Sequence, residues 1–136
     1  MVDDVVVNKA ATIERCLRRI REEYGGDESE FANNFTKQDS IILNLQRACE
    51  ASIDMGMRVV RVKQLGIPQS SRDVFVVLED AGIIDSDLSQ HLQAMVGFRN
   101  IAIHDYRKMD LDVVRSLIET HLTDLSHFAE IALRAT

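Results

Sequence analysis

The sequence predicts an all-α fold, an antiparallel four-helix bundle with an additional short helix. Apolar residues recur every three or four positions in several long segments, and no alternation with a period of two persists anywhere. One proline and six glycines in 136 residues leave few interruptions to a helix. Three long amphipathic segments and a shorter fourth one can share one apolar core, which is how helical bundles are built.

The first helix is predicted over about residues 2–24, followed by Gly25-Gly26, a pair that ends helices. The polar stretch after this pair, DESEFANNF, is expected to connect the first helix to the next one. The apolar residues of this first helix recur at helical spacing: Ile13, Cys16, Leu17, Ile20 and Tyr24.

A second helix is predicted from Thr36 to about Leu65. Thr36 and Asp39 resemble a capping box, in which two side chains satisfy the free N–H groups at a helix start. Gly66-Ile67-Pro68 is expected to stop the helix, because proline cannot continue one. The wide apolar face of this helix comprises Ile41, Leu45, Ala48, Cys49, Ser52, Met55, Gly56, Val59 and Val62.

Two shorter helices follow. Ser70 or Ser71 is expected to cap the first, which runs to about Ala81. Asp85 is expected to cap the second, which continues to about His104. The predicted buried residues are Val74, Phe75 and Leu78 in the first and Leu88, Leu92, Met95 and Val96 in the second.

The C-terminal segment is predicted to form the last helix of the bundle. Asp110 is expected to cap it, since aspartate is a favoured residue at that position. Its apolar positions again follow helical spacing: Val113, Val114, Leu117, Ile118, Leu122, Leu125, Phe128 and Leu133.

Composition and charge narrow the class of protein. The length fits a single domain, residues 1–136, with one core. The net charge of −6 argues against broad, sequence-blind binding to nucleic acid, so a role on RNA needs a local basic patch, concentrated by dimerisation. No apolar run reaches the roughly 20 residues that span a bilayer, and the acidic pair near the N-terminus is unlike an export signal. Cys16 and Cys49 are solitary, so we expect reduced core thiols and a cytoplasmic location.

The sequence shows no pattern typical of a bound metal or cofactor. His91, His121 and His127 lack a ligand spacing such as HExxH, so we expect no metal. No glycine-rich phosphate loop is visible, so we expect neither ATP bound by this chain alone nor another cofactor.

The segment from Arg99 to Tyr106, RNIAIHDY, carries the residues best suited to chemistry. A guanidinium can clamp a phosphate with several donors, and an imidazole can accept and donate a proton near neutral pH. RNA cleavage needs a base for the 2′-hydroxyl that attacks phosphorus and an acid for the leaving 5′-oxygen. His104 suits these proton transfers, and Arg99 suits stabilisation of the charged transition state, without a metal in this step.

Helix geometry divides these residues between two stripes. Each residue turns about 100°, so Arg99 and His104 lie about 140° apart on a regular helix. Asn100 lies four residues before His104 and could orient its imidazole, whereas Arg99 is nearly in line with Tyr106. These two stripes, Arg99 with Tyr106 and Asn100 with His104, could converge if the helix end opens. They could also converge if a second copy of the chain meets the first across a two-fold axis. On spacing alone, an arginine and a histidine near a helix C-terminus usually satisfy carbonyls and the helix dipole.

The segment RNIAIHDY resembles the R-x4-6-H signature of HEPN domains, in the R-x4-H-x-Y form of HepT-like toxins. The stretches LNLQRACEASIDMG and GIPQSSRDVFVVLEDAGII resemble the same subfamily in order and spacing. The resemblance covers roughly residues 36–110, and the motif is complete, with Arg99, Asn100, His104 and Tyr106 all present.

This resemblance implies a metal-independent endoribonuclease that acts as a homodimer, with two motifs facing each other across a cleft. Arg99 and His104 would be catalytic, with Asn100 in support. The resemblance also implies a minimal nucleotidyltransferase antitoxin, which silences the toxin by transferring AMP units to Tyr106. Each unit adds a bulky base and a negative phosphodiester, which can pair with Arg99 and occupy the space that RNA needs.

Two other functions stay open on the sequence. The motif could belong to a non-catalytic module that holds a nucleotide or docks the nucleotidyltransferase, which predicts a stable complex without RNA cleavage. Alternatively, the chain could be a bare dimeric scaffold, in which Arg99→Ala changes folding stability and nothing else.

Overall fold

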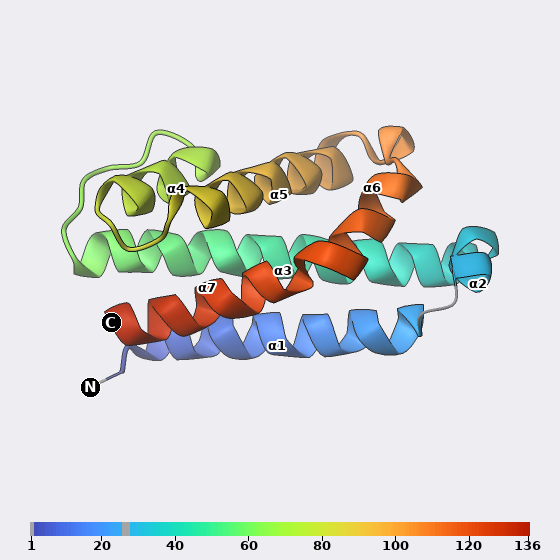
Figure 1. Cartoon of the computed structure of the whole chain (residues 1–136), viewed down its shortest axis with the longest axis horizontal. Helices are drawn as coiled ribbons and strands as arrows, with labels where there is room; N and C mark the ends of the chain where they lie inside the picture. The colour runs from blue at the N-terminus through green and yellow to red at the C-terminus, as the bar shows by residue number, and fades with distance from the viewer. Residues whose placement is uncertain (1, 26–27) are drawn as a thin grey trace.

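The computed structural model describes residues 2–25 and 28–136, and these residues form helices and connections without a strand. The long helices run alternately up and down, which confirms the predicted antiparallel four-helix bundle (Figure 1). They are α1 (Asp4–Tyr24), α3 (Phe35–Val62), α5 (Ser86–His104) and α7 (Leu122–Ala135). Shorter elements join them: α2 (Glu28–Asn33), α4 (Ser71–Asp80), the 3₁₀ turn η1 (Tyr106–Lys108), α6 (Leu111–Ser116) and the π-helical turn η2 (Leu117–His121). No helix in the described part of the chain is long and apolar enough to cross a membrane.

Helix α1 begins later than the predicted start near residue 2, because Asp3 caps it. The Asp3 carboxylate accepts hydrogen bonds from the backbone N–H groups of Val5 and Val6 at 3.0 and 3.1 Å. The helix ends at Tyr24 as predicted, where Gly25 adopts a left-handed φ of 55° that costs a glycine little. Gly26 lies outside the described residues.

The polar stretch after α1 contains the short helix α2, which the sequence analysis did not predict. Phe31 anchors this helix in the core, where its ring packs edge-on against Tyr24 with centroids 5.5 Å apart. The buried Gln38 amide donates hydrogen bonds to the carbonyls of Phe31 and Ala32 at 2.9 and 3.2 Å. One buried aromatic and one buried amide therefore hold a helical turn within an otherwise polar segment.

The predicted capping box at the start of the second long helix is wrong. Helix α3 begins at Phe35 because Asn34 is the cap, and its side chain accepts a hydrogen bond from the Lys37 N–H at 3.0 Å. Asp39, the expected partner of Thr36, instead accepts a hydrogen bond from the hydroxyl of Tyr106. The helix ends at Val62, before the predicted Leu65.

The predicted apolar face of α3 is buried except at its last member. Val62 is 45% exposed, because it lies on the final turn, beyond the packed part of the bundle. At the middle of the helix, Gly56 allows close packing, since an added Cβ would come within 2.7 Å of Val74 Cγ1. Phe75 and Phe128 meet edge-on nearby, with ring centroids 5.5 Å apart. Helix α3 is thus the centre of the core.

The caps predicted for the two shorter helices are confirmed. Ser70 accepts a hydrogen bond from the Asp73 N–H at the start of α4, and Asp85 accepts one from the Leu88 N–H at the start of α5. Their predicted apolar residues are all buried. Helix α5 ends at His104 as predicted, and this places the RNIAIHDY segment at one end of the bundle (Figure 1).

The predicted single C-terminal helix is divided into α6, η2 and α7. Asp110 caps α6 as predicted, by accepting a hydrogen bond from the Asp112 N–H at 2.9 Å. The π-helical turn η2 rotates the following residues relative to an uninterrupted α-helix. Val113 is 47% exposed as a result of its place before this turn, whereas Val114 is buried.

Candidate active site at the end of helix α5

Arg99 is half-buried on the side of α5 that faces α4. Its Nη2 donates a hydrogen bond to Ser71 Oγ at 3.0 Å, and its Nε is buried without a hydrogen-bond partner. The guanidinium also lies near Cys49 of α3: burial raises the pKa of that thiol to about 12, and the charge of Arg99 opposes the rise. Arg99 therefore reaches from α5 into the junction with α3 and α4.

The guanidinium of Arg99 differs from the other half-buried guanidiniums in having no carboxylate partner among the described residues. Arg58 pairs with Asp3 at 3.0 Å, and Arg115 pairs with Asp112 at 3.1 Å. A half-buried cation without a counter-ion is poorly compensated, because burial weakens its interaction with water. Arg99 is thus ready to bind an anion.

His104 and Asn100 lie on an exposed face of α5. His104 is the last residue of the helix, and Asp105 leaves the helical conformation with φ −154° and ψ 59°. Asn100 is one turn earlier and is also exposed, as the spacing of four residues predicts. Solvent therefore reaches the imidazole, which leaves it available to a substrate.

Tyr106 does not lie in line with Arg99, because the helix ends two residues before it. It belongs to η1, and its hydroxyl donates a hydrogen bond to Asp39 Oδ1 at 2.5 Å. Partial burial and the negative Asp39 carboxylate raise the pKa of Tyr106 to about 12. The ring is nevertheless 44% exposed, so the hydroxyl is fixed at the surface.

The motif residues Arg99, His104 and Tyr106 share one end of the bundle but are not joined by hydrogen bonds or ion pairs in the part of the chain that the structure describes. Arg99 faces α4 while His104 faces solvent, which agrees with their predicted separation around the helix. A site that uses both must therefore be completed by movement of the helix end or by another molecule.

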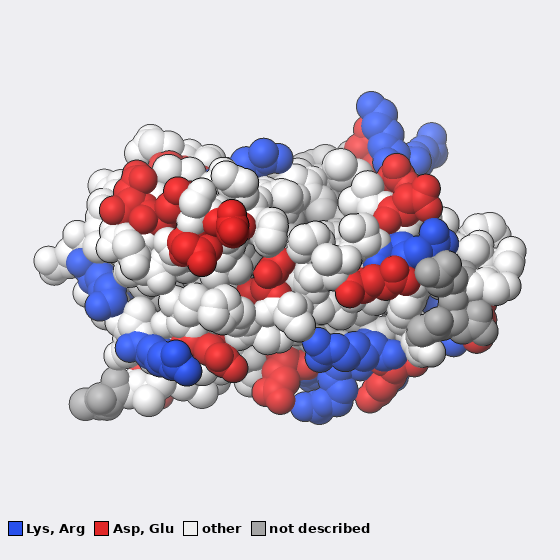
Figure 2. Space-filling view, viewed as in Figure 1, with Lys and Arg blue, Asp and Glu red and all other residues white. Residues whose placement is uncertain are grey.

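A groove of about 490 Å³ runs beside the motif, between α5 and the segment that follows it. Asn100 and Ile101 line it from α5, and Arg72 and Lys108 contribute positive charge. Figure 2 shows basic side chains projecting from this end of the bundle, where η1 supplies Arg107 and Lys108. Acidic residues lie among these cations, since Lys108 pairs with Asp105 at 3.3 Å.

Sequence analysis missed three residues that hold or flank the motif: Asp39, Ser71 and Arg72. Asp39 and Ser71 were assigned to helix caps, and their actual partners lie 67 and 28 residues away, beyond the reach of a spacing argument. Arg72 lies against Gly97 of α5, where an added Cβ would come within 2.7 Å of its Nη2. The one available signal was that all three fall within the stretch that resembles the family.

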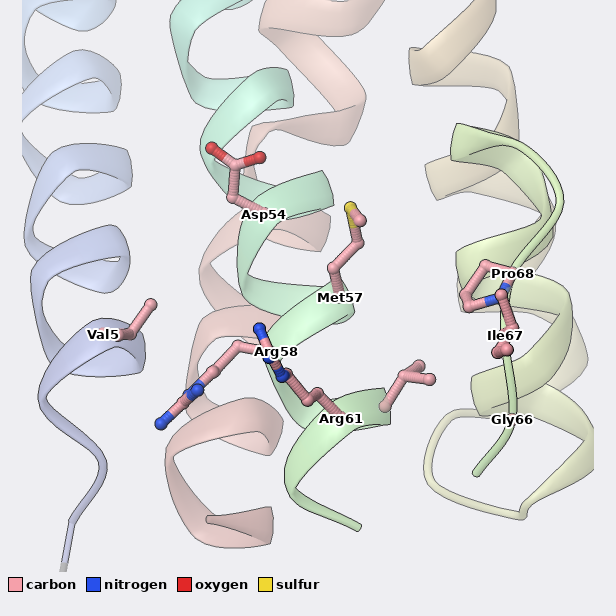
Figure 3. Close-up of a pocket in the computed structure, with 9 residues that line it drawn as sticks. Val5, Asp54, Met57, Arg58, Arg61, Gly66, Ile67 and Pro68 are labelled. Carbon is pink, nitrogen blue, oxygen red and sulfur yellow. The ribbon is translucent and has the colours of Figure 1, made fainter. Parts of the chain in front are cut away.

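A second hollow, of about 480 Å³, lies at the opposite end of the bundle (Figure 3). Met57 and Arg61 of α3 and the loop residues Ile67 and Pro68 line it (Figure 3). No motif residue lines this hollow. Among the described residues, one group of side chains has a geometry that could hold a metal ion: His91, His121 and Asp124, on the flank of the bundle. This group contains no motif residue. The chemistry suggested by the motif is therefore confined to the end of α5.

Comparison with known proteins identifies the family of this chain and the proteins that share its fold. A family model described as Ribonuclease HepT-like matches residues 13–132. The mRNA nuclease HepT of Shewanella oneidensis is 50% identical over 130 residues, which are 96% of this chain and 97% of that protein. A solved structure of a tri-AMPylated HEPN toxin of Shewanella oneidensis in complex with MNT antitoxin is 50% identical, with a TM-score of 0.90 over 95% of this chain and 96% of that one. The cytosolic protein YutE of Bacillus subtilis, of unknown function, shares the fold at 17% identity, with a TM-score of 0.81 over 96% of this chain and 88% of that one.

Proposed function

This chain belongs to the HepT-like ribonuclease family, and we propose that it is the toxin of a toxin–antitoxin pair and cuts mRNA with Arg99 and His104. The observation that carries this proposal is the half-buried Arg99 guanidinium, which has no carboxylate partner among residues 2–25 and 28–136, on the same helix as a solvent-accessible imidazole. A guanidinium so placed suits a phosphate, and the imidazole suits proton transfer.

The proposed reaction is an internal transfer within the ribose-phosphate chain. His104 accepts the proton of the 2′-hydroxyl, whose oxygen attacks the adjacent phosphorus, and the bond to the 5′-oxygen breaks. A second imidazole in its protonated form donates the proton that the leaving oxygen requires. Arg99 stabilises the negative charge that develops on the phosphate oxygens. The products are a 2′,3′-cyclic phosphate and a 5′-hydroxyl, and no metal takes part in this step.

A homodimer supplies the second imidazole that the proposed reaction needs. No hydrogen bond joins Arg99 to His104 among the described residues, and a second copy brings a second motif to the same phosphate. Ile101 and Ile103, exposed to 42% and 44%, flank the motif and offer apolar surface for such a contact. A two-fold axis near the end of α5 therefore satisfies both the chemistry and the exposed apolar residues.

Tyr106 is the proposed acceptor of AMP from a nucleotidyltransferase antitoxin. Its hydroxyl oxygen attacks the α-phosphorus of ATP, pyrophosphate leaves, and Asp39 accepts the hydroxyl proton across the 2.5 Å hydrogen bond. The added phosphodiester is negative and lies beside the basic η1 turn. It can therefore occupy the positive surface that RNA needs.

Cleavage by matched variants tests the proposal. Purified wild-type protein is expected to cut RNA, and both His104→Ala and Arg99→Ala are expected to reduce the rate by about 10²–10⁴-fold, because each removes a group that acts on the reacting phosphate. His127→Ala is the control, since it removes another exposed histidine, on α7, and is expected to leave the rate unchanged. Equal cleavage by wild type and His104→Ala would contradict the proposal, and a stable antitoxin complex without any cleavage would favour a binding module.

A further inference from the structure

Two histidines and one aspartate converge on the flank of the bundle, away from the motif. His91 lies on α5, His121 ends the π-helical turn η2, and Asp124 lies in the first turn of α7. Oδ2 of Asp124 lies 3.1 Å from Nδ1 of His91 and 2.9 Å from Nδ1 of His121. The two imidazole rings meet edge-on with centroids 4.8 Å apart. Three side chains from three elements thus direct ligand atoms at one small volume.

We propose that this cluster binds a divalent transition-metal ion of the Zn²⁺ type. Zn²⁺ takes imidazole nitrogen at about 2.0–2.1 Å and carboxylate oxygen at about 2.0–2.2 Å, and tetrahedral geometry then separates the ligand atoms by about 3.4 Å. The observed nitrogen–oxygen separations are shorter by only a few tenths of an ångström, and one ligand atom from each residue lies within 4.8 Å of the other two. Small side-chain rotations therefore complete three of four coordination positions.

Binding replaces protons with the metal ion. A neutral histidine that donates to the aspartate from Nδ1 must move its single proton to Nε2, by exchange with water, before the Nδ1 lone pair can bind the metal. A protonated histidine instead releases its Nδ1 proton to solvent and keeps the proton on Nε2. The aspartate carboxylate supplies one negative charge to the cation. A water molecule can complete the tetrahedron, since a hollow of about 200 Å³ lined by His91, Ala94 and His121 adjoins the ligands.

The surroundings favour a cation. Figure 2 shows acidic side chains gathered over the part of the bundle formed by α4 and the start of α5. This part of the chain includes the exposed residues Asp80, Asp85 and Asp87. Asp87 lies one helical turn before His91. The resulting negative potential raises the local concentration of divalent cations.

The π-helical turn is what brings His121 into the cluster. A π-helical turn rotates the residues after it relative to a continuous α-helix, and such turns occur frequently at functional sites. The two histidines lie 30 residues apart along the chain, and Asp124 follows His121 by three residues, so no motif such as HExxH announces them. The proposed site departs from the expectation of no metal, which rests on sequence spacing, for His91 and His121.

The bound ion would act as a clamp rather than as part of RNA cleavage. It would join α5 to η2 and α7 at a point 13 residues before His104, which is about 20 Å along the helix. A ligand that binds the folded chain alone stabilises it, so the expected effect is on the melting temperature. The inference therefore stands independently of the proposed ribonuclease mechanism.

Calorimetric titration of the full chain with ZnCl₂ tests the proposal, using protein without a histidine tag. One Zn²⁺ per chain is expected, and Co²⁺ is expected to give the visible absorption bands of a four-coordinate ion. His91→Ala and His121→Ala should each weaken binding by about 100-fold or more, since even outer-shell partners of a metal contribute 10–100-fold. His127→Ala, which removes an exposed histidine outside the cluster, should bind Zn²⁺ like wild type. At free Zn²⁺ about 100-fold above Kd, the melting temperature should rise by about 10 °C.

The proposed site would be overturned if wild type did not bind Zn²⁺ at millimolar concentration. It would also be overturned if the doubly substituted His91→Ala, His121→Ala chain bound Zn²⁺ with the affinity of wild type. Asp124→Asn gives a second measurement, because the amide still accepts a hydrogen bond but is a poor Zn²⁺ ligand. Weaker binding with an unchanged circular dichroism spectrum supports coordination by the carboxylate. Displacement of Zn²⁺ by equimolar Mg²⁺ would also contradict the assignment, since Mg²⁺ prefers oxygen ligands.

Discussion

At the scale of single residues, the function depends on groups whose partners are far away in the sequence. Arg99 is positioned by a serine on α4, and Tyr106 by an aspartate on α3. The sequence motif was enough to identify Arg99, Asn100, His104 and Tyr106 as candidates. It could not show that Arg99 is half-buried or that Tyr106 leaves the helix, because both depend on packing between elements.

Ser71→Ala is expected to lower the efficiency of RNA cleavage by about 10-fold, because the guanidinium of Arg99 loses its hydrogen-bond partner and with it a fixed position. Folding stability should change by no more than about 1 kcal/mol, which is the typical net contribution of one hydrogen bond. Measurement of kcat and KM together with thermal unfolding separates the two effects. If Ser71→Ala cuts RNA like wild type, Ser71 does not position Arg99.

Tyr106→Phe is expected to abolish AMP addition when the chain is produced together with its nucleotidyltransferase. The substitution removes the acceptor oxygen and keeps the ring, so the fold should be preserved. Intact-mass spectrometry measures the added AMP units directly. Survival of the added mass in Tyr106→Phe would mean that another residue is the acceptor.

Asp39→Asn is expected to lower the pKa of Tyr106 from about 12 toward the ordinary value of 10.0, because a neutral amide no longer opposes ionisation. A tyrosine whose pKa is raised on folding stabilises the folded state fully below pH 10, and this contribution is lost between about pH 10 and 12. Absorbance of the tyrosinate, taken as the difference from Tyr106→Phe, follows the titration. An identical curve for wild type and Asp39→Asn would show that the carboxylate has no influence.

At the scale of the helices, periodicity and caps predicted most of the fold. The starts of α4 and α5 followed from Ser70 and Asp85, since a cap acts on the N–H groups of its own first turn. The prediction failed where contacts distant in sequence decide the structure. Helix α2 depends on the buried Phe31, and the π-helical turn η2 occurs inside an apolar pattern that looks continuous.

Two glycines inside helices provide a matched test of helix packing. Gly56→Ala is expected to destabilise the fold by about 1–2 kcal/mol, because the new methyl group meets the short, buried Val74 side chain at 2.7 Å and overpacking outweighs the gain in helix propensity. Gly97→Ala is expected to be neutral or to stabilise by up to about 1 kcal/mol, because its neighbour is the movable end of Arg72. Urea denaturation measures both free energies of unfolding, and equal effects would contradict this difference.

At the scale of the whole molecule, an acidic chain presents a few basic residues beside the proposed RNA site. The net charge is −6, while Arg72, Arg107 and Lys108 lie near the end of α5. The separation of Arg99 from His104 within one chain makes the second copy part of the proposed site.

A mixture of Arg99→Ala and His104→Ala chains tests the role of the second copy. Each variant alone is expected to be strongly impaired. Subunit exchange should restore partial cleavage, because the mixed dimer combines the guanidinium of one chain with the imidazole of its partner, and water replaces the missing second imidazole as the acid. Light scattering should show two chains per particle in every sample. If exchange is complete and cleavage does not return, each site uses both groups of one chain.

The chemical nature of the RNA ends tests the central claim most directly, since it reports which oxygen attacked phosphorus. Fragments produced by wild type without added divalent cations should end in a 2′,3′-cyclic phosphate and a 5′-hydroxyl, and His104→Ala should produce them about 10²–10⁴-fold more slowly. Fragments with 3′-hydroxyl and 5′-phosphate ends, or the same fragments from His104→Ala at the wild-type rate, would contradict an imidazole and a guanidinium acting on the 2′-oxygen.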